Sequence, residues 1–143
     1  MKLARRPVWT LRTRVRRLTV KLPFSRQQPA GGRPPEEEHE PYRQINVDEA
    51  RKLLDDGKVQ VIDVREPWEY NNGHLPGARL VPLNALLRQP KQYLDKDGLV
   101  FVCASGERSA VACEMAAAMG FKEVYNVAGG TIDWIAKGYP VEK

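Results

Sequence analysis

Apolar residues after about position 42 gather in short blocks that polar turns separate. The blocks at residues 59–64 and 99–102 are almost uninterrupted apolar runs, which is typical of strands that are covered on both faces of a parallel sheet. Shorter blocks at residues 79–81 and 124–127 predict two further strands. These four segments are too short for helices and are rich in β-branched residues, so we expect them to form one sheet.

Between the strand blocks the apolar positions have helical spacing. Asn46 and Glu49 form a capping-box pattern ahead of an apolar stripe that Gly57 ends, which predicts a helix start and a helix stop. Four further helices are predicted, at residues 67–73, 83–87, 109–119 and 131–137. Strand and helix therefore alternate, and this predicts an α/β fold with a mostly parallel sheet. In such sheets the functional site lies beyond the carboxyl ends of the strands.

Charge divides the chain into two parts. The net charge is +5, yet residues 1–40 contain 10 Lys and Arg against 4 Asp and Glu, whereas residues 41–143 contain 13 against 14. Residues 27–38 are rich in proline, glycine and glutamate, a composition typical of a flexible linker. We therefore predict a flexible basic extension at 1–40 and a folded domain at 41–143. The near-neutral domain has no charge pattern for nucleic acid.

The extension allows several interpretations. Apolar residues recur at spacings of three and four between arginines in residues 1–26, as in an amphipathic helix. Residues 18–22 alternate as a strand would, and the charge density also suits a disordered tail. A segment bound to anionic membrane and a mitochondrial or plastid transit peptide are the sharper alternatives. No apolar run approaches the length of a membrane span, and we expect a cytoplasmic protein.

Two cysteines, Cys103 and Cys113, are too few for a disulfide scaffold or a four-cysteine zinc site, and no metal is predicted. Cys103 directly follows an apolar strand block and precedes a predicted helix. A thiol at this place faces unpaired N–H groups and the positive end of the helix dipole, and Arg108 adds a positive charge. Gly106 lets the loop curl so that its amides point inward. These conditions lower a thiol pKa and predict that Cys103 is a nucleophile.

Several spaced motifs then resemble one known family. They are Asp63-Val64-Arg65-Glu66, Glu69-Tyr70, residues 73–78 (GHLPGA), residues 103–109 (CASGERS), Val124-Tyr125-Asn126, Gly129-Gly130, Trp134 and Gly138-Tyr139-Pro140. In this order they make residues 42–143 resemble a single-domain rhodanese, a member of the sulfurtransferase family. The resemblance implies a three-layer domain with a five-stranded, mostly parallel sheet flanked by helices.

The resemblance also implies a mechanism. Cys103 would take a sulfane sulfur from thiosulfate or a persulfide and pass it to a thiophilic acceptor, either cyanide or a thiol. A sulfur-relay protein is a further possible partner, and no cofactor or metal is implied. The residues expected to bind the substrate are those of the loop after the cysteine, Ala104, Ser105, Gly106, Glu107, Arg108 and Ser109.

Other residues have smaller roles in this interpretation. Glu107 places a negative charge in a loop that should attract anions, and we expect it to point outward beside a cation. Asp63 and Arg65 follow a strand and are expected to form an ion pair that organises the region near the site. His74 is expected to be a packed or hydrogen-bonded structural residue, and Cys113 a buried residue of the predicted helix.

Three function classes remain open at this point. The first is a sulfurtransferase, and the second is a non-catalytic rhodanese-like binding module. The third is a cysteine-dependent phosphatase or arsenate reductase, which the same fold supports. In the phosphatases that this family resembles, the loop is longer, with five residues between cysteine and arginine. Here four residues lie between Cys103 and Arg108. The shorter loop favours sulfur transfer over phosphoryl transfer.

Overall fold

The computed structural model describes residues 40–143, and every prediction for residues 1–39 lies outside this range. The described part contains a five-stranded sheet with the strand order β3-β7-β6-β4-β5. The strands are β3 (Arg43–Ile45), β4 (Gln60–Asp63), β5 (Arg79–Leu80), β6 (Leu99–Val102) and β7 (Val124–Val127). All four pairings are parallel, which confirms the predicted α/β class and its parallel sheet.

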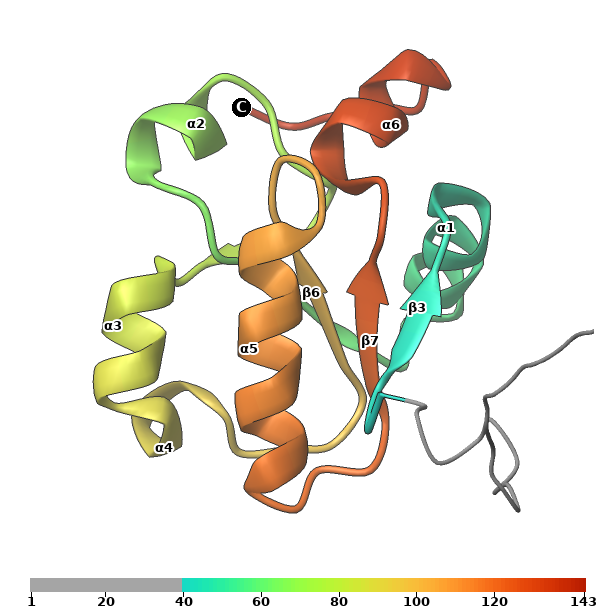
Figure 1. Cartoon of the computed structure of the whole chain (residues 1–143). Helices are drawn as coiled ribbons and strands as arrows, with labels where there is room; N and C mark the ends of the chain where they lie inside the picture. The colour runs from blue at the N-terminus through green and yellow to red at the C-terminus, as the bar shows by residue number, and fades with distance from the viewer. Residues whose placement is uncertain (1–39) are drawn as a thin grey trace, which may run out of the picture. The chain divides into compact units, whose positions relative to one another are not determined.

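Helices cover both faces of the sheet (Figure 1). Their bounds are α1 (Val47–Asp56), α2 (Pro67–Asn71), α3 (Leu83–Arg88), α4 (Pro90–Tyr93), α5 (Glu107–Ala118) and α6 (Gly130–Ala136). Side chains of α3 and α5 share one hydrophobic core, and those of α1 and α6 share the other. The sheet therefore separates two cores, as the predicted three-layer arrangement requires.

The central strand β6 shows why its sequence is apolar throughout. Leu99 and Phe101 belong to the core under α5, whereas Val100 and Val102 belong to the core under α1 and α6. All four side chains are fully buried, because successive residues of a strand point to opposite faces and both faces are covered. This burial holds the strand firmly where the next residue, Cys103, begins the loop.

Local signals also place α1. The side chain of Asn46 accepts the backbone N–H of Glu49 at 2.8 Å, and the Glu49 carboxylate accepts the backbone N–H of Asn46 at 2.9 Å. The helix ends at Gly57, which has a φ of 71°. Both ends of this helix agree with the predicted capping box and glycine stop.

Three elements differ from the sequence prediction. The pattern did not indicate β3, because this edge strand has only three residues and two are exposed. It also missed α4, a single turn that Pro90 opens. Helix α5 begins at Glu107, two residues before the predicted start at 109, so Glu107 and Arg108 belong to its first turn. Within residues 40–143 no helix is both long and apolar enough to cross a membrane.

Candidate active site

A short loop joins β6 to α5 at the carboxyl end of the central strand (Figure 1). Cys103 is the first residue of this loop, directly after Val102 of β6. Its thiol is buried, and the residue is only 1% exposed. The backbone N–H of Gly106 donates to Sγ at 3.1 Å, and the Ser109 hydroxyl lies 3.4 Å from the same atom. The structure thus brings Cys103 together with two of the predicted loop residues.

The surroundings of Cys103 favour its thiolate. Burial raises the pKa of the thiol. Hydrogen bonds from the Ser109 hydroxyl and from the backbone N–H groups of Ser109, Gly106 and Ser105 together lower the pKa by more than burial raises it. The pKa of Cys103 therefore falls below its ordinary value. These donors belong to the loop and to the first turn of α5, where N–H groups have no partner within the helix. Neutral dipoles of the loop therefore provide the stabilisation of the anion.

Gly106 is needed for the shape of this loop. It precedes α5 with a φ of +105°, a conformation that side-chain-bearing residues rarely adopt. A Cβ at this position would also overlap the carbonyl oxygen of Ala128 in the loop after β7. The loop can therefore turn its amide toward Sγ only with glycine at position 106.

The loop between β7 and α6 holds the backbone around Cys103. The carbonyl oxygen of Cys103 accepts hydrogen bonds from the backbone N–H of Thr131 at 2.9 Å and from its hydroxyl at 3.1 Å. The next carbonyl, that of Ala104, accepts the backbone N–H of Ile132 at 3.1 Å. The start of α6 thus fixes the first two residues of the loop between β6 and α5.

Arg108 carries its positive charge in an ion pair that the sequence did not indicate. Its guanidinium donates to both carboxylate oxygens of Glu69 in α2, with Nη1–Oε2 and Nη2–Oε1 distances of 2.8 and 2.9 Å. This pairing lowers the pKa of Glu69 to about 2 and raises that of Arg108. The pair attaches α2 to the start of α5, and the negative charge of Glu69 offsets the field of Arg108.

Glu107 points outward, as expected, but its partner differs from the prediction. The side chain is exposed, and its carboxylate accepts a hydrogen bond from the Ser105 hydroxyl instead of pairing with a cation. The only nearby cation of α5, Arg108, is taken by Glu69. Glu107 therefore keeps its charge on the solvent side of the loop.

Asp63 and Arg65 form the expected ion pair at the end of β4. Arg65 Nη2 lies 2.7 Å from Asp63 Oδ2, and both side chains are buried. Arg65 also donates to the carbonyl oxygen of Gly73 at 2.9 Å. These hydrogen bonds stay within residues 63–73, so the pair organises the connection between β4 and β5.

His74 and Cys113 are both buried outside the loop. The His74 ring is stacked on Tyr70 with centroids 3.6 Å apart, and its Nδ1 lies 2.9 Å from the Tyr70 carbonyl oxygen. Cys113 lies in α5, where burial and the nearby Glu40 raise the pKa of its thiol. Neither residue contributes a donor to Cys103 Sγ.

Sequence analysis missed a second polar contact of the site. The Ser109 hydroxyl lies 2.5 Å from Oδ1 of Asn126, a buried residue of β7. The Asn126 amide nitrogen in turn faces the Gln44 side chain of β3 at 2.9 Å and the Gly106 carbonyl oxygen at 3.2 Å. The signal in the sequence that could have indicated the role of Asn126 is its place as an amide residue in the largely buried strand VYNV, because a buried polar group needs hydrogen-bond partners.

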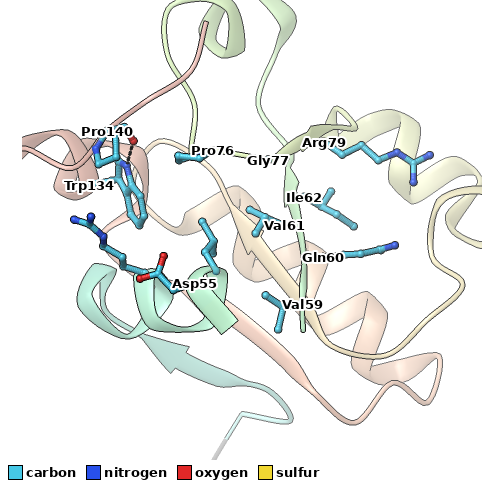
Figure 2. Close-up of a pocket in the computed structure, with 12 residues that line it drawn as sticks. Asp55, Val59, Gln60, Val61, Ile62, Pro76, Gly77, Arg79, Trp134 and Pro140 are labelled. Atoms are coloured by element: carbon cyan, nitrogen blue, oxygen red, sulfur yellow. Dashed lines mark hydrogen bonds between the residues drawn. The ribbon is translucent and has the colours of Figure 1, made fainter. Parts of the chain in front are cut away.

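A hollow among the described residues lies away from this loop. It has a volume of about 510 Å³, and Val59, Val61, Pro76 and Trp134 are among its lining residues, as Figure 2 shows. None of residues 103–109 lines it. The described residues also contain no group of three or more His, Cys, Asp or Glu side chains that could hold a metal ion.

Comparisons with known proteins identify the family of the domain. The family model of the rhodanese-like domain matches residues 46–137. A putative sulfur carrier protein of Bacillus subtilis is 32% identical over 108 residues, which is 75% of this chain and 58% of that protein. Thiosulfate sulfurtransferase 18 of Arabidopsis thaliana is 31% identical over 68% of this chain and 81% of its own length. The chain thus spans little more than half of the Bacillus relative.

A solved structure gives the same result for the fold. The rhodanese-related protein of Thermoplasma volcanium has 35% sequence identity and a TM-score of 0.63, with 71% of this chain and 98% of that chain covered. The fold and site place the chain in the class of parallel α/β domains that hold a buried cysteine at the end of the central strand, with a loop amide donating to its thiol. Within that class, the chain belongs to the rhodanese-like domain family.

Proposed function

We propose that the protein is a sulfurtransferase that moves a sulfane sulfur from thiosulfate or a persulfide to a thiol or cyanide, through a persulfide on Cys103. The observation that supports it best is the Sγ atom at the start of α5, which accepts the Gly106 N–H and lies within reach of Ser109. Relatives that are named sulfurtransferases support sulfur transfer at the level of the family.

The first half-reaction loads sulfur onto the thiol. The Cys103 thiolate attacks the outer sulfur of thiosulfate, and a bond forms between Sγ and that sulfur. The bond between the two thiosulfate sulfurs breaks, and sulfite leaves with its electron pair. The negative charge then lies on the outer sulfur of the persulfide, where N–H groups of the loop and of the α5 terminus can stabilise it.

The second half-reaction unloads it. A thiolate or cyanide attacks the outer sulfur, its bond to Sγ breaks, and the Cys103 thiolate forms again. Cyanide leaves as thiocyanate, and a thiol leaves as a new persulfide. One relative is named a putative sulfur carrier protein, which supports a protein thiol in a sulfur relay as an acceptor.

The charges of the site bear on the choice of donor. Glu69 neutralises Arg108, and Glu107 keeps its negative charge at the surface. Attraction of an anionic donor thus depends on the amides of the loop and the α5 dipole, which act only at short range. We therefore propose that persulfide donors, which carry less charge than thiosulfate, are also substrates.

Intact-mass measurement tests the proposal. The reduced protein is incubated with thiosulfate, and a gain of one sulfur atom is expected in the wild type. The same gain is expected in Cys113→Ala, because Cys113 gives no hydrogen bond to Cys103 Sγ. Cys103→Ser should gain none and should show no sulfurtransferase turnover. If the wild type gains no sulfur from thiosulfate or from a small persulfide, the protein is a binding module instead.

An aryl phosphate assay separates the remaining alternative. The loop has four residues between Cys103 and Arg108, and Arg108 is paired with Glu69 instead of facing an empty phosphate cradle. We expect no turnover of the aryl phosphate. Turnover that is lost in Cys103→Ser would show that the loop accepts a phosphoryl group and would favour a phosphatase.

A further inference from the structure

A buried chain of polar side chains connects the Cys103 thiol with the edge strand β3. Ser109 Oγ lies 3.4 Å from Cys103 Sγ and 2.5 Å from Asn126 Oδ1. Asn126 Nδ2 lies 2.9 Å from Gln44 Oε1. Ser109 and Asn126 are 0% and 2% exposed, so water has little access to their polar atoms.

The orientation of the Asn126 amide follows from its neighbours. Its nitrogen faces two oxygen atoms, the carbonyl of Gly106 at 3.2 Å and the side-chain oxygen of Gln44. A backbone carbonyl can only accept, so a flipped amide would place Oδ1 against an acceptor. The amide nitrogen therefore stays on that side, and Oδ1 faces the Ser109 hydroxyl as an acceptor.

The Ser109 hydroxyl has one proton and two possible acceptors. While Cys103 is a neutral thiol, the shorter contact favours donation to Asn126 Oδ1, and the hydroxyl oxygen accepts the S–H proton. Once Cys103 is a thiolate, the Ser109 hydroxyl can donate its proton to Sγ, but Asn126 Oδ1 then loses its hydrogen-bond donor. An unpartnered buried oxygen is costly, so the two acceptors compete.

We propose that Asn126 is a positioning residue that competes with the Cys103 thiolate for the single proton of Ser109, and so keeps the thiolate reactive. This inference rests on the proposed role of Cys103 as the nucleophile. A thiolate that is less strongly hydrogen-bonded is more basic and attacks sulfur faster. After sulfur transfer the charge moves to the outer sulfur, Sγ is neutral, and the hydroxyl returns to Asn126. Ser109 thus changes its acceptor in each half-reaction.

Other charged or titratable groups surround the site and stay in place when residue 126 is changed. They are Arg108 and Glu107 on α5, Glu69 on α2, Asp63 and Arg65 after β4, Cys113 further along α5, and Glu40 beyond Gln44. These groups are common to all variants below. Asn126→Ala also removes the contact with the Gly106 carbonyl oxygen, and comparison of the double variant with Ser109→Ala separates that effect from the Ser109 proton.

The experiment is the pH dependence of Cys103 alkylation by iodoacetamide, with the modified residue located by mass spectrometry. Asn126→Ala frees the Ser109 proton for Sγ and should lower the apparent pKa of Cys103 by about one unit. Ser109→Ala should raise it. The double variant should match Ser109→Ala, because without the hydroxyl Asn126 has nothing to compete for. Gln44→Ala is the control, since Gly106 still holds the Asn126 amide, and should shift the pKa by less than about 0.3 units.

A second measurement uses the wild-type chain and needs no change at position 126. The side-chain amide resonances of Asn126 should titrate with the same midpoint as alkylation of Cys103, and this titration should vanish in Cys103→Ser. The inference is overturned if Asn126→Ala raises the pKa or leaves it unchanged, or if the Asn126 resonances do not move. Neither measurement uses a sulfur donor, so a failed sulfur-transfer assay would refute the proposed function alone.

Discussion

Replacing Glu69 with Gln removes the negative charge that faces Arg108 but keeps the size of the side chain. In the wild type the carboxylate receives two guanidinium hydrogen bonds, at 2.8 and 2.9 Å. The pKa of Glu69 falls from 4.5 to about 2, mainly because of these bonds, and the backbone N–H of Glu66 adds to the effect. The substitution therefore tests how much the pair stabilises the junction of α2 and α5.

The magnitude follows from the pKa. At about 1.4 kcal/mol per pKa unit, the lowering is equivalent to ~3–4 kcal/mol at most. The Arg108 side chain is 37% exposed, so water screens the pair, and part of the shift belongs to Glu66. We expect Glu69→Gln to lower the free energy of unfolding by ~1–2 kcal/mol at pH 7.

The pH dependence has a definite sign. A carboxylate with a depressed pKa in the folded state stabilises the fold above its unfolded pKa, and loses this effect as the pH falls through the folded pKa. The difference between wild type and Glu69→Gln should therefore be complete above about pH 5 and shrink toward pH 2. Urea unfolding at pH 7, 5, 4 and 3 measures it. Glu114→Gln, at an exposed position of α5, is the control and should change stability by less than ~0.5 kcal/mol.

The same variant has a chemical readout at the site. With Glu69 neutral, the charge of Arg108 is no longer offset near Cys103. The ratio of alkylation rates with iodoacetate and iodoacetamide should rise ~5-fold, the equivalent of ~1 kcal/mol. A stability difference of equal size at pH 7 and pH 3, together with an unchanged ratio, would refute the view that Glu69 acts through its charge.

Three further predictions concern the loop, its support and the extension. Gly106→Ala and Gly120→Ala replace glycines with φ values of +105° and +104°, but only the Cβ added at position 106 would overlap a carbonyl oxygen. We expect Gly120→Ala to lower the free energy of unfolding by ~1–2 kcal/mol. Gly106→Ala should lower it by more and should abolish sulfur loading. Arg65→Ala leaves Asp63 buried without its partner and should cost ~3–5 kcal/mol in urea unfolding; a loss below 1 kcal/mol would show that water replaces the guanidinium. Deleting residues 1–40 should leave the sulfurtransferase rate unchanged, because the site lies in the described domain, and a loss of this rate would contradict the prediction. The full chain should bind anionic vesicles more weakly as salt rises, and the deletion should also weaken this binding.

Much of the fold could be predicted because its signals are local. The apolar run of β6, the capping box of Asn46 and Glu49 and the glycine at 57 each act within a few residues, and the structure has all of them. Cys103 followed from the same logic, since its position depends only on where β6 ends and where the next helix begins. The type and order of most elements therefore follow from short stretches of sequence, whereas the short β3 and α4 do not.

The details of the site depend on residues that are distant in sequence. Glu69 and Arg108 are 39 positions apart, and Gln44 and Asn126 are 82 apart. Which of them meet depends on the parallel pairing of β3 with β7 and on the packing of α2 beside the loop, and neither leaves a local pattern. A charge such as that of Arg108 has many possible partners in a chain, and only the packed sheet and helices bring one carboxylate within hydrogen-bonding distance. The sequence alone thus determined where Cys103 lies, between the end of β6 and the start of α5, whereas the tertiary structure decided which charges and protons surround it.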